Sequence, residues 1–286
     1  MKSKRIIFPF FAFFLLLGLP GISAEGGEEI QQDRFTDIRE ISVSAPDWDI
    51  LLGPSSRDSR VRLSDYQSRD YRIDIAQTGD RLNIEIRPKR ALRIFSTGQP
   101  KLSLTVPENA LLEISTASGD IRLQEVITGE LRVSSASGDM EGRGISGSLE
   151  FSSASGDLDL GGMQGDISAK TSSGDIQIRR VEGLMSFQSS SGEIMIGEAT
   201  GGLEAKTSSG DIRFENLSIF QGARFASVSG DIELDVLGTL SEYSIECKST
   251  SGDIRVFDYR TEDRLNAGDG DVPLTAATTS GDISIY

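Results

Sequence analysis

The stretch Ser153-Ala-Ser-Gly-Asp-Leu158 contains a tripeptide, Ser-Gly-Asp, around which the rest of the sequence is arranged. Between Thr116 and Tyr286 this tripeptide occurs eight times, and a ninth copy has Glu193 in place of the aspartate. Successive copies are 18 to 22 residues apart, except for the last interval of 29 residues. A period this regular indicates a repeat architecture. The nine glycines predicted to lie at structural turns are Gly119, Gly138, Gly156, Gly174, Gly192, Gly210, Gly230, Gly252 and Gly281.

Each repeat is predicted to contain two short strands and two turns. Apolar and polar residues alternate after the tripeptide, as in Ile176-Gln-Ile178, and again after a second glycine, as in Gly147-Ser-Leu-Glu-Phe151. This alternation is typical of half-buried strands, and the glycines suit corners that need a positive φ angle. One 18-residue unit cannot bury its own apolar face, so the units are expected to stack. The sequence therefore predicts an all-β fold, a parallel β-solenoid of 18-residue coils with an N-terminal β-rich cap.

A column of hydroxyl residues supports this stacking. The residue three positions before each repeat glycine is Ser or Thr in all nine copies. Continuing the alternation from Leu149 and Phe151 places Ser153 on the inward face. Hydroxyls there can bond to backbone groups of the corner and from coil to coil. A nucleophilic serine is the functional alternative, but no base accompanies the residue and every coil carries it, so we expect a structural role.

The acidic residue after each repeat glycine is the sharpest candidate for chemistry. Stacked coils would place these carboxylates about 5 Å apart along one edge, where a hard cation such as Ca²⁺ would relieve their repulsion. The alternative is that each aspartate serves its turn by accepting backbone N–H bonds. The pattern differs from the calcium-binding nonapeptide repeat, because it lacks doubled glycines. The candidate metal-ligating residues are Asp139, Asp157, Asp175, Glu193 and Asp211.

The chain before the repeats divides into segments of different composition. Residues 1–24 have a basic start, an apolar run and a small-residue cleavage site, which predict a secretory signal peptide. Residues 25–37 are polar and are expected to form a disordered linker. Residues 38–115 are expected to form the β-rich cap, with a hairpin around Gly79, and residues 116–286 to form the solenoid.

The last repeats depart from the regular spacing. The segment from Phe257 to Leu274 interrupts the period and is rich in acids, which predicts an acidic loop. The chain then resumes with Ser280-Gly-Asp-Ile-Ser-Ile-Tyr286, which is expected to form the final coil. An open final coil would be a template for strand pairing. We therefore expect the loop to fold over it; otherwise, two rods would meet end to end or a partner strand would add there.

Composition and charge narrow the function classes. The chain has no histidine, the commonest general base and zinc ligand. Its one cysteine, Cys247, falls where Phe151 lies in its coil, so it is expected in the core. Trp48 is interpreted as a core anchor or as an exposed ring that contacts a sugar. The net charge of −16 over residues 111–286 predicts repulsion of nucleic acid and anionic lipid. This charge suits cations or basic partners, or it simply keeps a β-rich rod soluble.

These features resemble a known family. Exported proteins with Ser-x-Ser-Gly-Asp-Ile repeats form the bacterial "putative adhesin" family of unknown function, which includes LiaG-type proteins. The resemblance runs from Ile38 to Tyr286 and includes the Leu104-Thr-Val-Pro107 step and repeats such as Ser153-Ala-Ser-Gly-Asp-Leu158. It implies a β-solenoid in the cell envelope, and it implies no particular binding residues.

The sequence favours a non-enzymatic cell-envelope protein, either an adhesin-like binding module or a structural scaffold, located in the periplasm, on the cell surface or in the medium. A Ca²⁺-binding acidic rod is the alternative. A carbohydrate-active β-helix enzyme is a second one, although equivalent repeated acids single out no catalytic pair. No cofactor other than Ca²⁺ is expected. The expected partners are an envelope protein or a glycan, not nucleic acid, and no membrane span is expected after signal cleavage. The rod is expected to be monomeric or to associate end to end.

Overall fold

The computed structural model describes residues 33–57, 60–64, 71–89 and 100–286. The expected signal peptide, residues 1–24, lies outside the described residues. None of the described segments is a helix with the length and apolar character needed to cross a bilayer.

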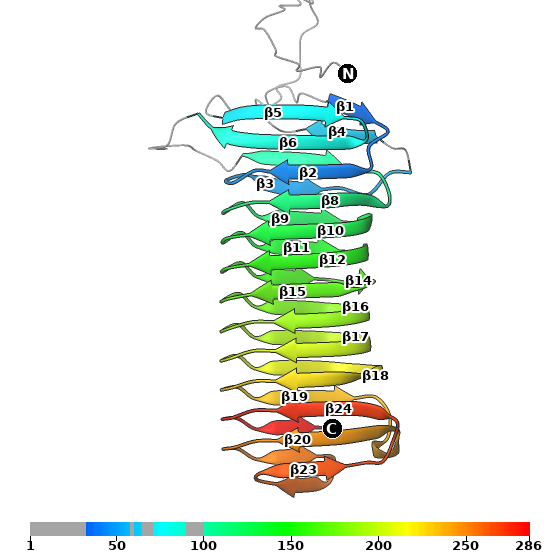
Figure 1. The fold of residues 1–286 in the computed structure, drawn as a ribbon, viewed down its shortest axis with the longest axis vertical. Helices are drawn as coiled ribbons and strands as arrows, with labels where there is room; N and C mark the ends of the chain where they lie inside the picture. The colour runs from blue at the N-terminus through cyan, green and yellow to red at the C-terminus, as the bar shows by residue number, and fades with distance from the viewer. Residues whose placement is uncertain (1–32, 58–59, 65–70, 90–99) are drawn as a thin grey trace, which may run out of the picture.

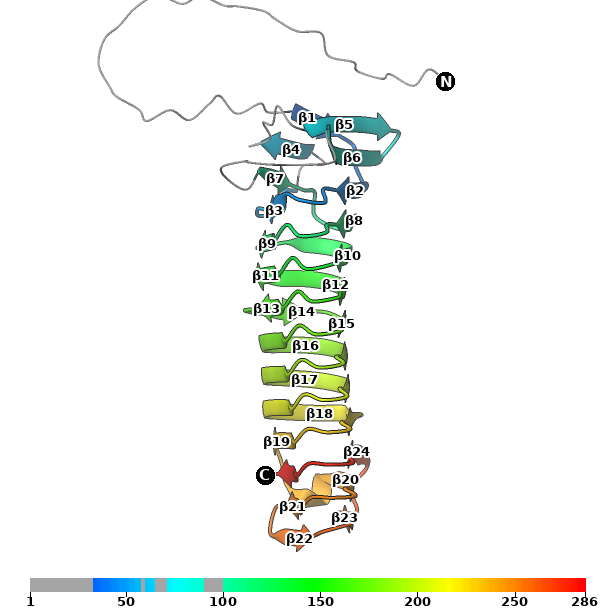
Figure 2. The same cartoon turned by 90° about the vertical axis from the view of Figure 1, so that its left-hand side faces the viewer.

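Two stacks of mostly parallel strands run along a rod and enclose its core (Figures 1 and 2). The stack that we name the A face follows the Ser-Gly-Asp corner and contains β3 (Asp49–Leu52), β7 (Lys101–Thr105), β9 (Ile121–Gln124), β11 (Met140–Arg143), β13 (Leu158–Leu160), β19 (Ile232–Val236), β21 (Ile254–Val256) and β25 (Ile283–Ile285). The B face contains β2 (Glu40–Ser44), β6 (Arg81–Pro88), β8 (Ala110–Ser115), β10 (Ile127–Ser135), β12 (Ile145–Ser153), β15 (Ile167–Thr171), β20 (Tyr243–Lys248) and β24 (Val272–Ala277).

Three long strands bend around the second corner of their coils, opposite the Ser-Gly-Asp corner, and so belong to both faces. They are β16 (Ile176–Gln188), β17 (Ile194–Lys206) and β18 (Ile212–Ala226). The short strand β14 (Met163–Gln164) lies at the same corner one coil earlier, and the 3-10 turn η1 (Leu240–Glu242) precedes β20. The predicted all-β, parallel β-solenoid is therefore confirmed.

The register follows the 18-residue period of the sequence. Leu149 pairs with Ile167, and Ile167 pairs with Met185. Each of these side chains is buried, whereas Glu150 between the inward positions is exposed, as the alternation predicts. Neighbouring coils are held by a continuous backbone ladder, which satisfies the polar groups of every inner strand.

One inward column on the B face alternates large and small side chains from coil to coil. Its successive members are Phe151, Ala169, Phe187, Ala205, Phe225 and Ala276. Each alanine leaves room for the rings above and below it, because coils that are about 4.8 Å apart cannot all carry a freely oriented ring. Phe214 from the A face fills the remaining space, with its ring centroid 5.3 Å from that of Phe225.

At the N-terminal end, the coil order in space differs from the order in the sequence. The strand β2 lies between β6 and β8, and β3 lies between β7 and β9. Antiparallel strands close this end: β5 (Tyr71–Thr78) pairs with β6, β4 (Arg60–Ser64) with β7, and β1 (Asp33–Thr36) with β4. The predicted hairpin around Gly79 is thus confirmed.

Two predicted boundaries at this end are wrong. The solenoid does not begin at residue 116, because β2, β3, β6, β7 and β8 already form parallel coils in register with the repeats. The expected linker, residues 25–37, ends early, since Asp33–Thr36 is the strand β1. Paired strands therefore extend the rod toward the N-terminus, beyond the residues that carry the repeat motif.

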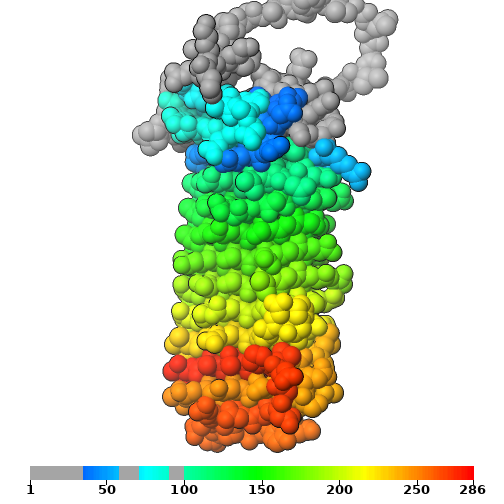
Figure 3. Space-filling model, turned by 45° about the vertical axis from the view of Figure 1, so that its right-hand side comes forward, coloured from blue at the N-terminus to red at the C-terminus, as the bar shows by residue number. Residues whose placement is uncertain are grey.

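The C-terminal end has the same inverted order. The strand β24 lies between β18 and β20, and β25 lies between β19 and β21. Figure 3 shows this coil as a red band between earlier, yellow and orange parts of the chain. The prediction that Ser280–Tyr286 forms the final coil of the rod is therefore wrong, because both edges of β25 are paired.

The segment expected to be an acidic loop is largely β structure. It contains β22 (Tyr259–Thr261) and β23 (Arg264–Ala267), which pair antiparallel with β21 and β20. We name these two strands the capping hairpin. It covers the end of the rod, as expected of this segment, but the coil beneath it is residues 243–256 and not the C-terminal coil.

Candidate binding surfaces

The glycine of each Ser-Gly-Asp copy allows neighbouring coils to approach closely. A Cβ atom added at Gly138 or Gly156 would lie 2.0 or 2.1 Å from the carbonyl oxygen of the glycine one coil away. Eight of the nine repeat glycines lack a positive φ, so the expected reason for glycine at this corner is wrong. The positive φ is found at the opposite corner, where Gly147 and Gly165 have φ of 125° and 121°.

The column of hydroxyl residues holds the same corner together. Ser153 Oγ accepts a hydrogen bond from the N–H of Gly156 at 2.7 Å, and Thr171 Oγ1 does the same for Gly174 at 2.9 Å. Further along the rod, Ser227 Oγ donates to the carbonyl oxygen of Gly210 in the preceding coil. These side chains are buried, as predicted for Ser153, and their bonds confirm the structural role.

The acidic column forms a ladder of side-chain to backbone bonds. Asp157 Oδ1 accepts from the N–H of Asp175 at 2.8 Å, and Asp175 Oδ1 accepts from the N–H of Glu193 at 2.8 Å. In the described part of the chain, Glu193 accepts no such bond from Asp211, and the ladder resumes between Asp211 and Asp231. One carboxylate oxygen of each laddered aspartate is therefore engaged by the rod, as the turn interpretation expects.

The predicted metal ligands lie in this ladder, one per coil. The structure places Asp139, Asp157, Asp175, Glu193 and Asp211 at successive Ser-Gly-Asp corners of the rod. Within the described ranges there is no group of three or more His, Cys, Asp or Glu side chains that could hold a metal ion. Calcium binding by this column stays a prediction.

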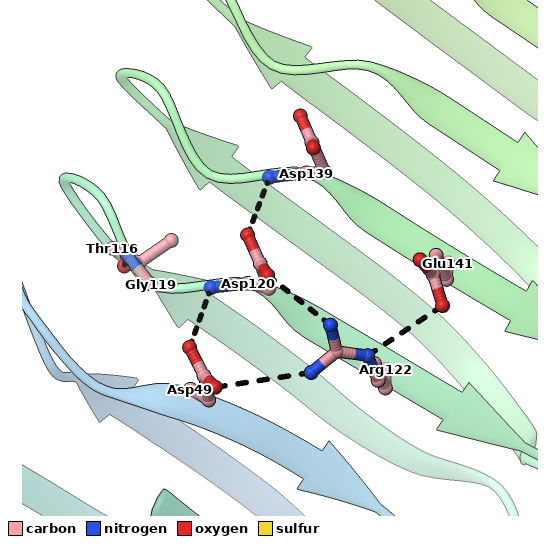
Figure 4. A network of polar contacts seen from close by, with 7 residues as sticks. All are labelled: Asp49, Thr116, Gly119, Asp120, Arg122, Asp139 and Glu141. Carbon is pink, nitrogen blue, oxygen red and sulfur yellow. Dashed lines mark hydrogen bonds and ion pairs between the residues drawn. The ribbon is translucent and has the colours of Figure 1, made fainter. Parts of the chain in front are cut away.

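Figure 4 shows the N-terminal start of the ladder. Asp49 takes the place of a repeat aspartate and accepts from the N–H of Asp120 at 3.2 Å. The guanidinium of Arg122 contacts the carboxylates of Asp49 at 3.8 Å, Asp120 at 3.2 Å and Glu141 at 3.5 Å. This arginine is fully used in neutralising acids of three neighbouring coils.

Trp48 and Cys247, the only tryptophan and the only cysteine of the sequence, both lie in the core. Trp48 is buried and packs edge-on against Tyr71, with ring centroids 5.3 Å apart, which confirms a core anchor. Cys247 is buried in the inward B-face column, and burial together with nearby Glu246 raises the pKa of its thiol to about 12. Neither side chain is available to a ligand.

The outward residues that do not repeat line two open grooves, one on each face. The B groove has a volume of about 690 Å³ and is lined by backbone and by side chains that include Glu150, Asp166, Ser168, Leu184, Glu204 and Arg224. The A groove has a volume of about 640 Å³ and is lined by residues that include Arg122, Gln124, Glu141, Arg143, Asp159, Gly161 and Arg179.

The outward residues of the A groove lie outside the repeated motif and are not predicted by it. Arg143 and Arg179 stand on the same column of the A face, two coils apart, with Gly161 between them. Their spacing of 36 residues is twice the repeat period, so the signal is in the sequence. It becomes visible only when the outward positions are compared at the period of the repeat.

Several solved bacterial structures align with most of this chain. A "putative lipid binding protein" from Parabacteroides distasonis ATCC 8503 has a TM-score of 0.49 and 18% identity, with 91% of this chain and 98% of that chain covered. A "putative adhesin" from Bacteroides fragilis NCTC 9343 has a TM-score of 0.45 and 10% identity, with 91% and 98% covered. A "putative adhesin" from Parabacteroides distasonis has a TM-score of 0.44 and 16% identity, with 73% and 97% covered.

No curated protein matches the chain. The model of the Toastrack DUF4097 family matches residues 38–286, which include the coils at both ends of the rod and the capping hairpin. The chain therefore belongs to the Toastrack DUF4097 family.

Proposed function

We propose that this protein is an exported, non-enzymatic binding module of the cell envelope. The observation that carries the proposal is how the rod uses its residues. The repeated glycines, hydroxyls and most of the repeated acids are engaged in holding one coil to the next. The outward residues that vary from coil to coil line the A groove and the B groove, where they face solvent and can contact a partner.

Several observations support the absence of a catalytic role. The sequence has no histidine, and the single thiol is buried with its pKa raised to about 12. A nucleophilic cysteine needs the opposite, a lowered pKa and access to substrate. In the column three positions before the repeat glycines, the hydroxyls of Ser153 and Thr171 are buried and accept backbone hydrogen bonds, so they are poor nucleophiles.

Export is supported by the composition of residues 1–24, which have the charge and hydropathy pattern of a signal peptide. A rigid rod with capped ends suits presentation of a surface at a distance from its point of attachment. Its acidic surface favours partners that carry cations or neutral polar groups over polyanions. An envelope glycan or an envelope protein fits this description.

Binding to isolated cell envelopes tests the proposal. The purified protein should be retained by envelopes of the producing cell, whereas an unrelated protein of similar size and net charge should not. Retention lost after removal of glycans or of proteins would identify the class of partner. The absence of retention, or turnover of a glycan that is abolished by changing one carboxylate, would overturn the proposal.

A further inference from the structure

Arg143 and Arg179 differ from Arg122, the third arginine that lines the A groove. Among the described residues, neither forms an ion pair, although both are exposed on a strongly acidic rod. Several outward arginines of the rod instead contact a carboxylate of their own or a neighbouring coil. They include Arg122, Arg132, Arg180, Arg213 and Arg264.

The surface between Arg143 and Arg179 is open because the residues there, Gly161 and Gly162, have no side chains. A Cβ atom at Gly161 would lie 3.1 Å from Arg143 Cγ, which shows that the stem of this arginine lies across the glycine. A Cβ atom at Gly162 would meet nothing within 4 Å. Gly161 and Arg179 line both the A groove and a second, adjoining hollow of about 500 Å³. We name Arg143, Gly161, Gly162 and Arg179 the arginine notch.

We propose that the arginine notch binds the carboxylate of an acidic sugar, a uronic acid residue of an envelope glycan. This inference rests on the proposed function and names the ligand class of one of its surfaces. The two arginines start about 10 Å apart on alternate coils, so their side chains can reach one carboxylate from both sides. Guanidinium groups bind carboxylates through paired, charge-assisted hydrogen bonds.

The surroundings of the notch favour a sugar with a single negative charge. Glu141, Asp159 and Gln124 also line the A groove and offer acceptors and donors for sugar hydroxyls. The two carboxylates would repel free phosphate or a phosphate monoester more strongly than a uronate, because these anions carry more than one negative charge near neutral pH. The volume of the A groove, about 640 Å³, lies within the usual range of about 300–1,000 Å³ for small-ligand sites.

Calorimetric titration of the purified chain with glucuronate tests the site, with glucose and acetate as comparison ligands. We expect glucuronate to bind more tightly than either, because each of them offers only part of the recognised chemistry. Arg143→Gln and Arg179→Gln should each weaken glucuronate binding by about tenfold or more, the loss expected for a hydrogen bond between charged groups. Gly161→Glu should abolish binding, since its carboxylate would occupy the notch.

Arg224→Gln is the matched control, because Arg224 is also exposed and without an ion pair among the described residues, but it lines the B groove. It should leave glucuronate binding unchanged. No binding of glucuronate, equal binding of acetate, or equal losses in the Arg143 and Arg224 variants would overturn the inference. Envelope retention without glucuronate binding would overturn the notch alone, whereas failure of retention would overturn the proposed function.

Discussion

Phe151 and Glu150 are adjacent in the sequence and lie on opposite sides of one strand, so they provide a matched test at the scale of the residue. Phe151→Ala should lower the free energy of unfolding by about 3–5 kcal/mol, because it empties a buried ring position. Glu150→Ala should cost less than about 0.5 kcal/mol, since the ion pair of Glu150 with Arg132 at 3.2 Å is exposed. Urea unfolding measures both, and equal losses would contradict the inward and outward assignment.

Gly174 and Gly162 test whether close contact between coils requires glycine, because only Gly174 lies against the backbone of a neighbouring coil. Gly174→Ala should destabilise the rod by about 1–3 kcal/mol or more, because the new Cβ would lie 2.1 Å from the carbonyl oxygen of Gly156. Gly162→Ala should be neutral or slightly stabilising, since nothing lies within 4 Å of its Cβ position and its φ is not positive. Thermal unfolding of the two variants compares them. A Gly174 variant as stable as the parent would show that the coils can separate at little cost.

At the scale of the element, the aspartate ladder makes a prediction about side-chain chemistry. Asp157→Asn keeps an oxygen that can accept the N–H of Asp175, and it removes one charge from a column of like charges. Asp157→Ala loses the acceptor and should cost about 0.5–1.5 kcal/mol. We expect the Asn variant to be at least as stable as the parent and the Ala variant to be less stable in urea unfolding. The reverse order would mean that the charge itself is needed.

A calcium titration of the same ladder distinguishes a turn role from a cation site. A ligand that binds only the folded state must raise the melting temperature of the protein. Because one oxygen of each laddered aspartate already accepts a hydrogen bond from a backbone N–H group, we expect Ca²⁺ to leave the melting temperature unchanged. A rise that disappears in the Asp157→Asn, Asp175→Asn double variant would instead assign a cation site to this column.

At the scale of the whole molecule, the capping hairpin is expected to keep the rod monomeric. It covers the outer edges of β20 and β21, which would otherwise present unpaired backbone groups to another chain. Deletion of residues 259–270 removes both of its strands and should cause self-association, which light scattering detects as an increase in mass. A parent protein that is already dimeric or fibrous would contradict this role of the hairpin.

The sequence predicts the coil well and the order of the coils poorly. The alternation of Ile176 and Ile178 and the spacing of the glycines are local signals, and they specify strands, corners and inward faces. The neighbours of β25 are not specified in this way, because Ile283 pairs with Ile232 on one side and with Ile254 on the other. Coils that all present the same apolar pair are interchangeable partners, so the connections and caps decide their order.

The candidate site is less predictable for a related reason. The repeated residues of the motif build the rod, whereas the candidate binding residues lie at positions that differ between coils and carry no repeated signal. Arg143, Gly161 and Arg179 become neighbours only when the coils stack in register. Their unpaired state depends on where the acids of adjacent strands lie, which spacing alone does not determine.

The placement of β24 and β25 between coils formed by earlier residues has a consequence for biosynthesis. The ribosome makes residues 243–256 before residues 272–285, yet the later segment lies between the earlier one and the rest of the rod. Coils up to β19 can assemble as the chain emerges. The capped end can dock only after nearly the last residue is made. A chain cut before residue 272 would carry that end unattached, so proteases could distinguish an unfinished molecule from a finished one.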